Sequence, residues 1–380
     1  MFFRQLLVEE TACASYLVGC KTKGTFAVVD PRVELVDDYL ALADGQGARI
    51  DAVFETHLQA DHVFGLPQLV ERTGATAYLP EGSGVEFEHW ALADGESVRL
   101  GNTEFRALAT PGHAPAHHAY LVTDHARSPD PWMVLTGDAL LVGDAGRPDL
   151  HAHGAHTVEQ MARSLYRSIT DKLLTLPDDL VLFAAHHSGS VCGRGLSPTP
   201  VSTLGDERPN NKALQFGSEE EFASALTADT PPAPPEHAAI VAANRSGRSL
   251  ALTQALEFYV GKLGIEVNTD ADLGFMRWLT VKCPRRSRSS DHRFTSSTRT
   301  TRDSSPRAPW ASPGSSVDDA HTTYEELLAK GVEFTEEPTE RFYGTGCGLR
   351  DPFGNHLRIG EPKEGAIEMP DPTQFAAENT

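Results

Sequence analysis

The stretch Glu55-Thr-His-Leu-Gln-Ala-Asp-His62 decides the fold of this chain. It follows the short apolar run Ala52–Phe54, so we expect a strand that ends just before the first histidine. Asp61 and His62 would begin the next helix. This order brings three side chains that can bind a metal, His57, Asp61 and His62, close together after one strand.

Three further side chains of this kind follow apolar runs in the same manner. They close the segments Thr110-Pro-Gly-His113, Leu135-Thr-Gly-Asp138 and Ala184-Ala-His186. Loops at one edge of a sheet converge in space, so residues far apart in sequence can form one site. A single histidine is more often a surface or core residue than a ligand. Such groups at the ends of several strands favour a metal site.

The surrounding sequence predicts an α/β domain of about 245 residues. The helix expected over Thr157–Leu176 has apolar residues at helical spacing and stops at Pro177. The loops of this domain carry most of the histidines, because 12 of the 16 fall between His57 and His187. The predicted strands are Ala14–Val18, Phe26–Val29, Ala52–Phe54, Ala75–Leu79, Phe105–Leu108, Ala119–Val122, Met133–Leu135 and Leu180–Ala184.

Composition narrows the class of protein. A length of 380 residues suggests two domains, and 40% hydrophobic with 23% charged residues is a globular composition. The net charge of −20 disfavours nucleic acid and anionic membranes as partners, and no apolar run reaches the roughly 20 residues of a membrane span. The N-terminal residues look like neither a signal nor a transit peptide. Five scattered cysteines predict no disulfide framework, so we expect a cytoplasmic protein.

The metal-competent segments resemble the metallo-β-lactamase superfamily over about residues 1–247. The superfamily signature is His-x-His-x-Asp-His, followed by single His, Asp and His ligands, and the resemblance implies an αββα sandwich. One position departs from it, because Gln59 stands where the second histidine is usual. In the hydrolases of the superfamily that histidine binds the first of two zinc ions. An amide oxygen is a poor substitute for imidazole on zinc, so Gln59 counts against a two-metal hydrolase.

Within the superfamily, the chain is similar to persulfide dioxygenases of the glutathione-persulfide type. The segments that carry this similarity are Leu135–Leu150, Ser188-Gly-Ser-Val-Cys-Gly193, Leu196–Leu204 and Ala242–Gly247. The resemblance implies one Fe(II) held by His57, His113 and Asp138, and a reaction of a persulfide with O2 that yields sulfite and thiol. Two histidines and one carboxylate leave three iron positions open, as in non-haem oxygenases. Gln59 is not among these ligands.

The resemblance also assigns roles around the ligands. Asp61, His62 and His186 would orient ligands and water, although purely structural hydrogen bonding is the alternative. Asp61 and His62 complete the predicted catalytic set, and the outer positions, Gln59 included, are candidates for a second metal. The thiol that carries the persulfide and the oligomeric state stay open, a homodimer included. The alternative function is a zinc-dependent thioesterase of the glyoxalase II type.

Two residues are candidates for substrate binding. Arg147, in Gly146-Arg-Pro-Asp149, could pair with a substrate carboxylate or form an internal ion pair with Asp149. Cys192 could carry sulfane sulfur, as the Gly-Ser-x-Cys-Gly pattern of sulfur-transferring relatives implies, or be a buried thiol. We assign no role to three further histidines, His117, His118 and His187.

Residues 248–362 resemble the vicinal oxygen chelate (glyoxalase/bleomycin-resistance) family. This similarity rests on Ala255–Val267, Val317–Val332 and Leu349–Ile359 and implies βαβββ modules. Arg358 stands at the position of a metal-binding acid, and little sequence remains for a first strand. We therefore expect a partial, degraded and metal-free domain, followed by a tail over 363–380. A binding or resistance module acting through this domain is the alternative of a different class.

The run 285–316 interrupts this second region. It holds 10 Ser, 7 Arg and 4 Thr but only two acids, and its apolar residues are too few for one half-buried strand. A disordered basic loop is one interpretation and a basic recognition segment is another. Because recognisable sequence resumes at Val317, we predict a pair of compensating frame changes in the coding DNA, or an unfolded second domain.

Overall fold

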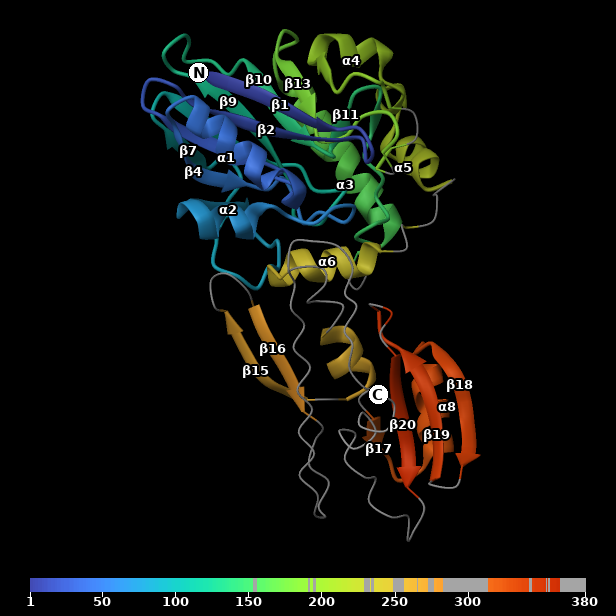
Figure 1. Cartoon of the computed structure of the whole chain (residues 1–380). Coiled ribbons are helices and arrows are strands. Elements are labelled where there is room, and N and C mark those ends of the chain that lie inside the picture. Colours follow the sequence, from blue (N-terminus) through green and yellow to red (C-terminus); the bar gives the residue numbers. More distant parts are fainter. Residues whose placement is uncertain are drawn as a thin grey trace. The chain divides into compact units, whose positions relative to one another are not determined.

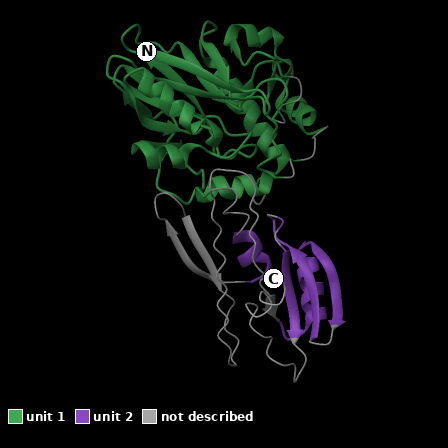
Figure 2. Cartoon of the chain, viewed as in Figure 1, with its two compact units in different colours: residues 1–250 green, residues 251–380 purple. Residues whose placement is uncertain are grey.

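The computed structural model divides the chain into two compact units, residues 1–250 and 251–380 (Figure 2). Each is considered by itself. The structure describes residues 1–152, 156–190, 192–193, 196–228, 233, 236–248, 256–264, 266–272, 277–282, 314–341, 344–352, 354 and 356–362.

The first unit contains two six-stranded sheets that stack face to face (Figure 1). The first sheet has the order β1 (Phe2–Val8), β2 (Cys13–Cys20), β3 (Thr25–Val29), β4 (Arg49–Phe54), β5 (Thr76–Pro80) and β6 (Trp90–Leu92). The second has the order β14 (Val201–Thr203), β13 (Val181–Ala184), β10 (Met133–Gly137), β9 (His118–Asp124), β8 (Thr103–Ala109) and β7 (Ser97–Leu100). A short hairpin, β11 (Leu140–Leu141) and β12 (Asp144–Ala145), follows β10.

Alternation along the strands separates the layers. In β2, Tyr16 and Val18 face the second sheet and join a core with Phe105 and Tyr120, whereas Leu17 points to the opposite face and packs with helical residues. A strand exposes successive side chains on opposite faces, so one strand buried on both sides serves two cores. This is why the central strands read as continuous apolar runs.

Helices cover both outer faces, which completes four layers in the order αββα. Side chains of α1, α2 and α6 pack on the first sheet, and side chains of α3 and α5 pack on the second. The capping box of Thr157 and Gln160 fixes the start of α3. The helices are α1 (Val36–Gly45), α2 (Leu66–Thr73), α3 (Val158–Asp171), α4 (Leu204–Asn210), α5 (Glu219–Ala228) and α6 (His237–Ser246). Short 3-10 turns are Val33–Leu35, Leu173–Thr175 and Lys212–Leu214.

All eight predicted strands are present, and the largest difference in bounds is at β4, which begins at Arg49 and not at Ala52. Short edge strands such as β6 and β7 were not predicted, since three or four residues give little periodicity. One local prediction is wrong: Asp61 and His62 do not begin a helix. They lie in a loop, and α2 starts only at Leu66, with proline in its first turn.

The second unit contains a βαβββ module, in agreement with the expected fold. It consists of β17 (Gly314–Ser316), α8 (Ala320–Ala329), β18 (Phe334–Arg341), β19 (Gly344–Arg350) and β20 (His356–Pro362), with sheet order β17-β20-β19-β18. A π-helical turn, Glu257–Lys262, comes earlier in this unit, followed by a hairpin of β15 (Glu266–Asp272) and β16 (Arg277–Lys282). Phe258 packs with Leu327, Cys347 and Ile359 in this unit's core.

The run 285–316 lies mostly outside the described residues, and the predicted tail 363–380 lies outside them entirely. Only the last residues of the run are described, and they form β17, which pairs in parallel with β20. The expectation that the run builds no strand is therefore wrong at its C-terminal end. At this site the pairing depends on backbone hydrogen bonds, which need no apolar alternation.

Arg358, which stands at the position of a metal-binding acid, and the nearby Glu361 both make local contacts. The Arg358 guanidinium donates to Glu336 at 2.6 Å. Glu361 accepts from the backbone N–H of Ala320 at the start of α8. These contacts give the described part of the unit no converging metal ligands.

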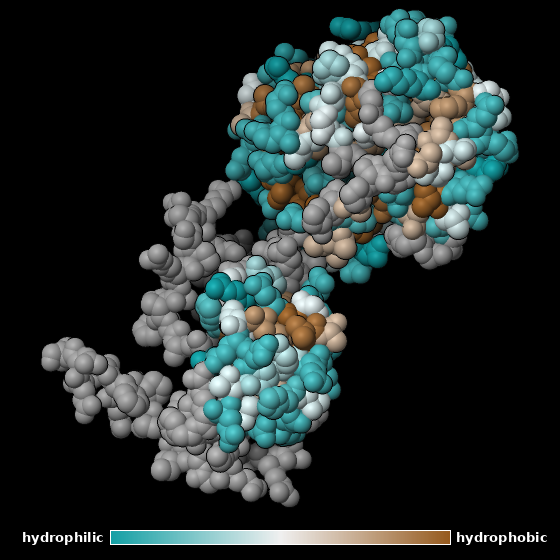
Figure 3. Space-filling view, turned by 90° about the vertical axis from the view of Figure 1, so that its right-hand side faces the viewer, coloured by the Kyte–Doolittle hydropathy of each residue, from teal (hydrophilic) through white to brown (hydrophobic). Residues whose placement is uncertain are grey.

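Hydrophobic side chains on the face of the molecule shown in Figure 3 are scattered among hydrophilic ones. The large apolar residues that are exposed belong to distant elements: Leu7, Trp90, Trp132, Val201, Val260 and Leu328. Among the described helices, none has the length and apolarity needed to cross a membrane.

Candidate metal centre

The residues predicted as ligands meet at one edge of the sandwich. His57 follows β4 of the first sheet, whereas His113 follows β8 and Asp138 follows β10 of the second. A single antiparallel bridge between His57 and His117 ties the two loop systems together. The site therefore depends on both sheets, and its residues come together only when the sandwich closes.

His57, His113 and Asp138 form a buried group whose ligand atoms all lie within 4.8 Å of one another. The Asp138 Oδ2 atom is 3.4 Å from His113 Nε2 and 4.0 Å from His57 Nε2. It is buried and has no hydrogen-bond partner in the described chain. Two imidazole nitrogens converging on an unpartnered carboxylate oxygen suit a divalent cation, so the residues fit the metal that the sequence implies.

The protonation states favour metal binding. Burial lowers the pKa of His57 well below its usual value, and the neighbouring imidazoles add to this effect. Burial also lowers the pKa of His113. For Asp138 burial acts in the opposite direction, but His186 and His113 outweigh it and hold the pKa of the carboxyl below its usual value. The group therefore offers two neutral imidazoles and one carboxylate at neutral pH.

Backbone contacts orient His113. Its Nδ1–H donates to the carbonyl of Arg147 at 2.8 Å, which leaves Nε2 as the ligand atom. Gly146 makes this approach possible, because a Cβ at that position would collide with the carbonyl of Asp138 and touch the His113 ring.

His186 bridges two carboxylates. Its Nδ1 lies 2.6 Å from Asp138 Oδ1 and its Nε2 lies 2.8 Å from Asp61 Oδ2. Burial alone would lower the pKa of His186, but the carboxylates of Asp138 and Asp61 raise it well above its usual value. As an imidazolium it donates from both nitrogens and fixes the orientation of the Asp138 carboxylate.

Asp61, His62 and His186 form a second group together with Cys13. Asp61 contacts His62 Nδ1 at 3.2 Å and accepts from the Cys13 thiol at 3.4 Å. Burial would raise the pKa of Cys13, but His186 and His62 lower it to about 7. The sequence did not single out Cys13, because nothing about a lone cysteine at the start of a strand indicates a neighbour 48 residues away.

Gln59 is engaged with an aspartate that is not one of the three predicted ligands. Its side-chain Nε2–H donates to Asp30 Oδ1 at 3.2 Å. Its backbone carbonyl accepts from the Asn244 side chain at 3.0 Å. Asn244 also holds the backbone of His62 and Phe64, so α6 braces the loop that carries Asp61.

The two predicted substrate-binding residues are both buried. The Arg147 guanidinium makes two hydrogen bonds to Asp149, at 2.7 and 2.6 Å, which is the internal ion pair considered as the alternative. Cys192 lies within 4.8 Å of ligand atoms of Asp138 and His186, and burial raises its pKa. Its thiol is therefore protonated at neutral pH. Substrate binding by either residue stays a prediction.

Two histidines lie beside the metal group: His117, to which the sequence assigned no role, and His151, which it did not single out. His117 Nε2 accepts the backbone N–H of Asp138 at 3.2 Å, while its Nδ1 meets the Thr110 hydroxyl at 2.8 Å. The His151 ring centroid is 6.0 Å from that of His113 and 6.2 Å from that of His57. Both were missed because their contacts depend on loop packing, which has no local sequence signal.

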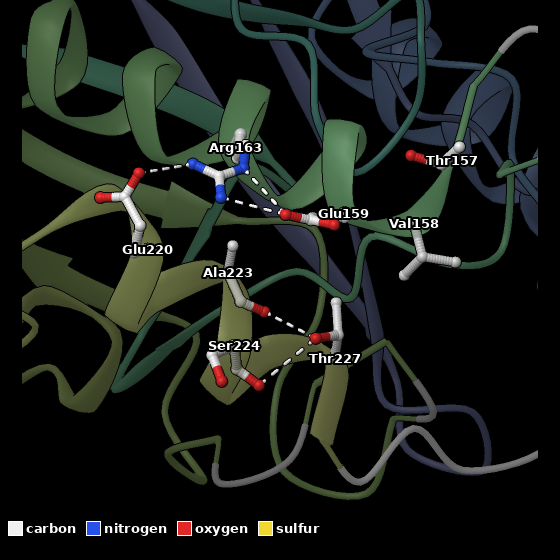
Figure 4. A pocket seen from close by; sticks show the side chains of 8 residues that line it. All are labelled: Thr157, Val158, Glu159, Arg163, Glu220, Ala223, Ser224 and Thr227. Carbon is white, nitrogen blue, oxygen red and sulfur yellow. Dashed lines mark hydrogen bonds and ion pairs between the residues drawn. The ribbon is translucent and has the colours of Figure 1, made fainter.

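A separate depression lies between α3 and α5 (Figure 4). Arg163 occupies it and pairs with Glu159, Glu219 and Glu220. Figure 4 shows the guanidinium between Glu159 and Glu220, so its charge is already neutralised within the protein. This depression holds none of the metal-site residues.

The fold and the His/Asp centre define a metal-binding protein of αββα architecture. The metallo-beta-lactamase superfamily model matches residues 8–186. The crystal structure of a metallo-beta-lactamase from Staphylococcus aureus subsp. aureus COL is 31% identical with a TM-score of 0.60, covering 66% of this chain and 73% of that chain. This chain belongs to the metallo-β-lactamase superfamily. The glyoxalase/bleomycin resistance protein/dioxygenase superfamily model matches residues 251–359, within the second unit.

More specific similarities are to persulfide dioxygenases and to a hydroxyacylglutathione hydrolase. The mitochondrial persulfide dioxygenase ETHE1 of Bos taurus is 29% identical over 221 residues, 58% of this chain and 78% of the relative. The crystal structure of ETHE1 from Myxococcus xanthus is 32% identical with a TM-score of 0.57, covering 66% of this chain and all of that chain. A hydroxyacylglutathione hydrolase of Methylococcus capsulatus is 32% identical over 176 residues, 45% of this chain and 60% of the relative.

Proposed function

We propose that this protein is a mononuclear iron dioxygenase that oxidises glutathione persulfide, or a related small persulfide, to sulfite and thiol. The observation that carries the proposal is the convergence of His57, His113 and Asp138, while the Gln59 side-chain amide donates to Asp30. The similarity to persulfide dioxygenases over most of the first unit supports it. Overall, a persulfide, O2 and water give a thiol, sulfite and two protons.

The donor set is the reason for preferring iron. Fe(II) held by two imidazoles and one carboxylate keeps three positions for O2 and the substrate sulfur. The protein's own part is to fix the donors: the Arg147 carbonyl orients His113, and His186 holds one oxygen of Asp138 so that the other faces the imidazoles. All three donors are buried, which limits access of bulk water to the reacting sulfur.

The substrate would be an anion, but the positive charge of the nearby His186 is already engaged within the protein. The His186 imidazolium lies between Asp61 and Asp138, so its charge is balanced by carboxylates while both remain in place. Binding of the thiol portion by Arg147 would require the guanidinium to share or leave Asp149. We therefore propose Arg147 as a substrate contact only for a carboxylate that can compete with that pair.

Metal analysis combined with O2 uptake tests the proposal. The purified full-length protein should contain about one iron per chain, and with glutathione persulfide it should consume O2 and form sulfite in equal amounts. A matched His113→Ala protein should do neither. Zinc in the purified protein, together with absence of O2 uptake after anaerobic loading with Fe(II), would refute the assignment.

A zinc thioesterase is the second candidate, favoured by the second group of Asp61, His62 and His186 and by the similarity to a hydroxyacylglutathione hydrolase. Gln59 weakens it, because no imidazole is available at that position. Hydrolysis of a lactoyl-glutathione thioester by the zinc-loaded protein distinguishes the two. Gln59→His is the informative variant, since an added imidazole should increase zinc retention.

A further inference from the structure

A chain of hydrogen bonds runs behind the ligand His57. The Asp30 carboxylate accepts the backbone N–H of Thr56 at 2.7 Å and the Thr56 hydroxyl at 3.0 Å. The same hydroxyl oxygen is 3.0 Å from His57 Nδ1. All of these residues are buried, so water does not compete for their hydrogen bonds.

The hydrogen bonds that link Asp30, Thr56 and His57 can run in only one direction. Thr56 has a single hydroxyl proton, which it donates in a hydrogen bond to the Asp30 carboxylate. The Thr56 oxygen must then accept from His57, which places the proton of that imidazole on Nδ1. The lone pair is left on Nε2, the atom that faces Asp138. The chain thus selects the tautomer that a metal needs.

Gln59 joins this chain at its far end. Its amide donates to the same Asp30 oxygen that accepts the Thr56 backbone N–H, and the side chain is fully buried. Asp30 itself has a left-handed backbone with φ of 50°, which aspartate tolerates but which costs free energy. A residue held in this way beneath a ligand indicates that its orientation matters.

We propose that Asp30 and Thr56 are positioning residues that hold His57 in its metal-binding tautomer, and that Gln59 stabilises the Asp30 carboxylate instead of binding metal. The position that departs from the superfamily signature thereby acts on the metal through three intervening groups. The inference rests on the metal group of the proposed function but not on the persulfide reaction.

Metal affinity of the full-length protein tests the proposal. Thr56→Val has nearly the shape of threonine but no hydroxyl, whereas Thr56→Ser keeps the hydroxyl. With Co(II) and Fe(II) alone as probes, competed by a chelator, Thr56→Val should bind about 10- to 100-fold more weakly, the range for loss of such outer partners. Thr56→Ser should stay within about threefold of the parent. The Co(II) d–d absorption should change only in Thr56→Val.

Gln59→Met supplies an independent variant should Thr56→Val not fold. It preserves bulk, removes the amide donor, and should weaken Co(II) binding by about 3- to 10-fold, less than loss of the hydroxyl. Parent-like affinity and Co(II) spectra in both variants would overturn the proposal. So would equal loss in Thr56→Val and Thr56→Ser, or a loss of affinity explained by a lower melting temperature of the metal-free protein. If the variants lose metal affinity as expected but the parent protein shows no O2 uptake, the positioning role stands and only the dioxygenase assignment fails.

Discussion

Two adjacent groups of side chains in the first unit both contain histidine and aspartate, but they differ in how far their polar atoms are already hydrogen-bonded. In the group of His57, His113 and Asp138, lone pairs converge and one carboxylate oxygen has no partner among the described residues. In the group of Cys13, Asp61, His62 and His186, Asp61 already contacts each of the other three side chains. Proximity of histidine and aspartate is therefore not enough to define a metal site. The hydrogen bonds that each group has already made decide the matter.

Removal of a converging ligand should have the largest effect. We expect Asp138→Ala and His113→Ala to weaken iron binding by well over 100-fold, beyond the range for outer partners, because each removes one of three donors. Iron content after gel filtration and chelator competition measure this. Near-parent iron retention in either variant would mean that the metal uses the second group.

Removal of a member of the self-paired group should have a smaller effect. Asp61→Asn keeps the size of the side chain but weakens its hold on His186, so we expect about a 10-fold loss of iron affinity with the stoichiometry preserved. Metal content and affinity measure this, and Asp138→Ala, measured in parallel, is the control. If Asp61→Asn empties the site as fully as Asp138→Ala, the contrast between the two groups is wrong.

The same contrast explains what the sequence could predict. Apolar runs identified eight strands of the first unit but missed the partly exposed edge strand β1. Strand ends identified a set of metal-competent residues, because a buried strand delivers its next polar residue to the sheet edge. The choice of His57, His113 and Asp138 from that set came from the family resemblance. The roles of Asp30, Cys13 and His117 depend on where loops cross, over separations for which one sequence has no local signal. The start of α2 was misjudged because Asp61 and His62 lie in a loop whose conformation is set by contacts of their side chains, which helical periodicity does not reveal.

Arg147 and Asp149 form another self-satisfied pair beside the site. Arg147→Lys cannot make the two parallel hydrogen bonds of the guanidinium, so we expect a loss of about 1–3 kcal/mol in unfolding free energy. Denaturant unfolding measures this, with the exposed Arg49→Lys as control. If Arg147 instead binds substrate, stability should hold and KM for glutathione persulfide should rise more than kcat falls.

His118 shows that burial alone does not make a histidine a ligand. It is buried on β9, its Nδ1 has no partner among the described residues, and burial lowers its pKa to about 4 despite the nearby Asp94. The unfolded chain binds a proton at His118 near pH 6.5, whereas the folded chain does so only near pH 4, so stability is lost as pH falls through this window. We expect this loss to be on the order of 1–3 kcal/mol in the parent. In His118→Gln the decline between pH 6.5 and 4 should be shallower by that amount. Urea unfolding of both proteins across this range measures the difference, and parallel curves would show that His118 is protonated in the folded state.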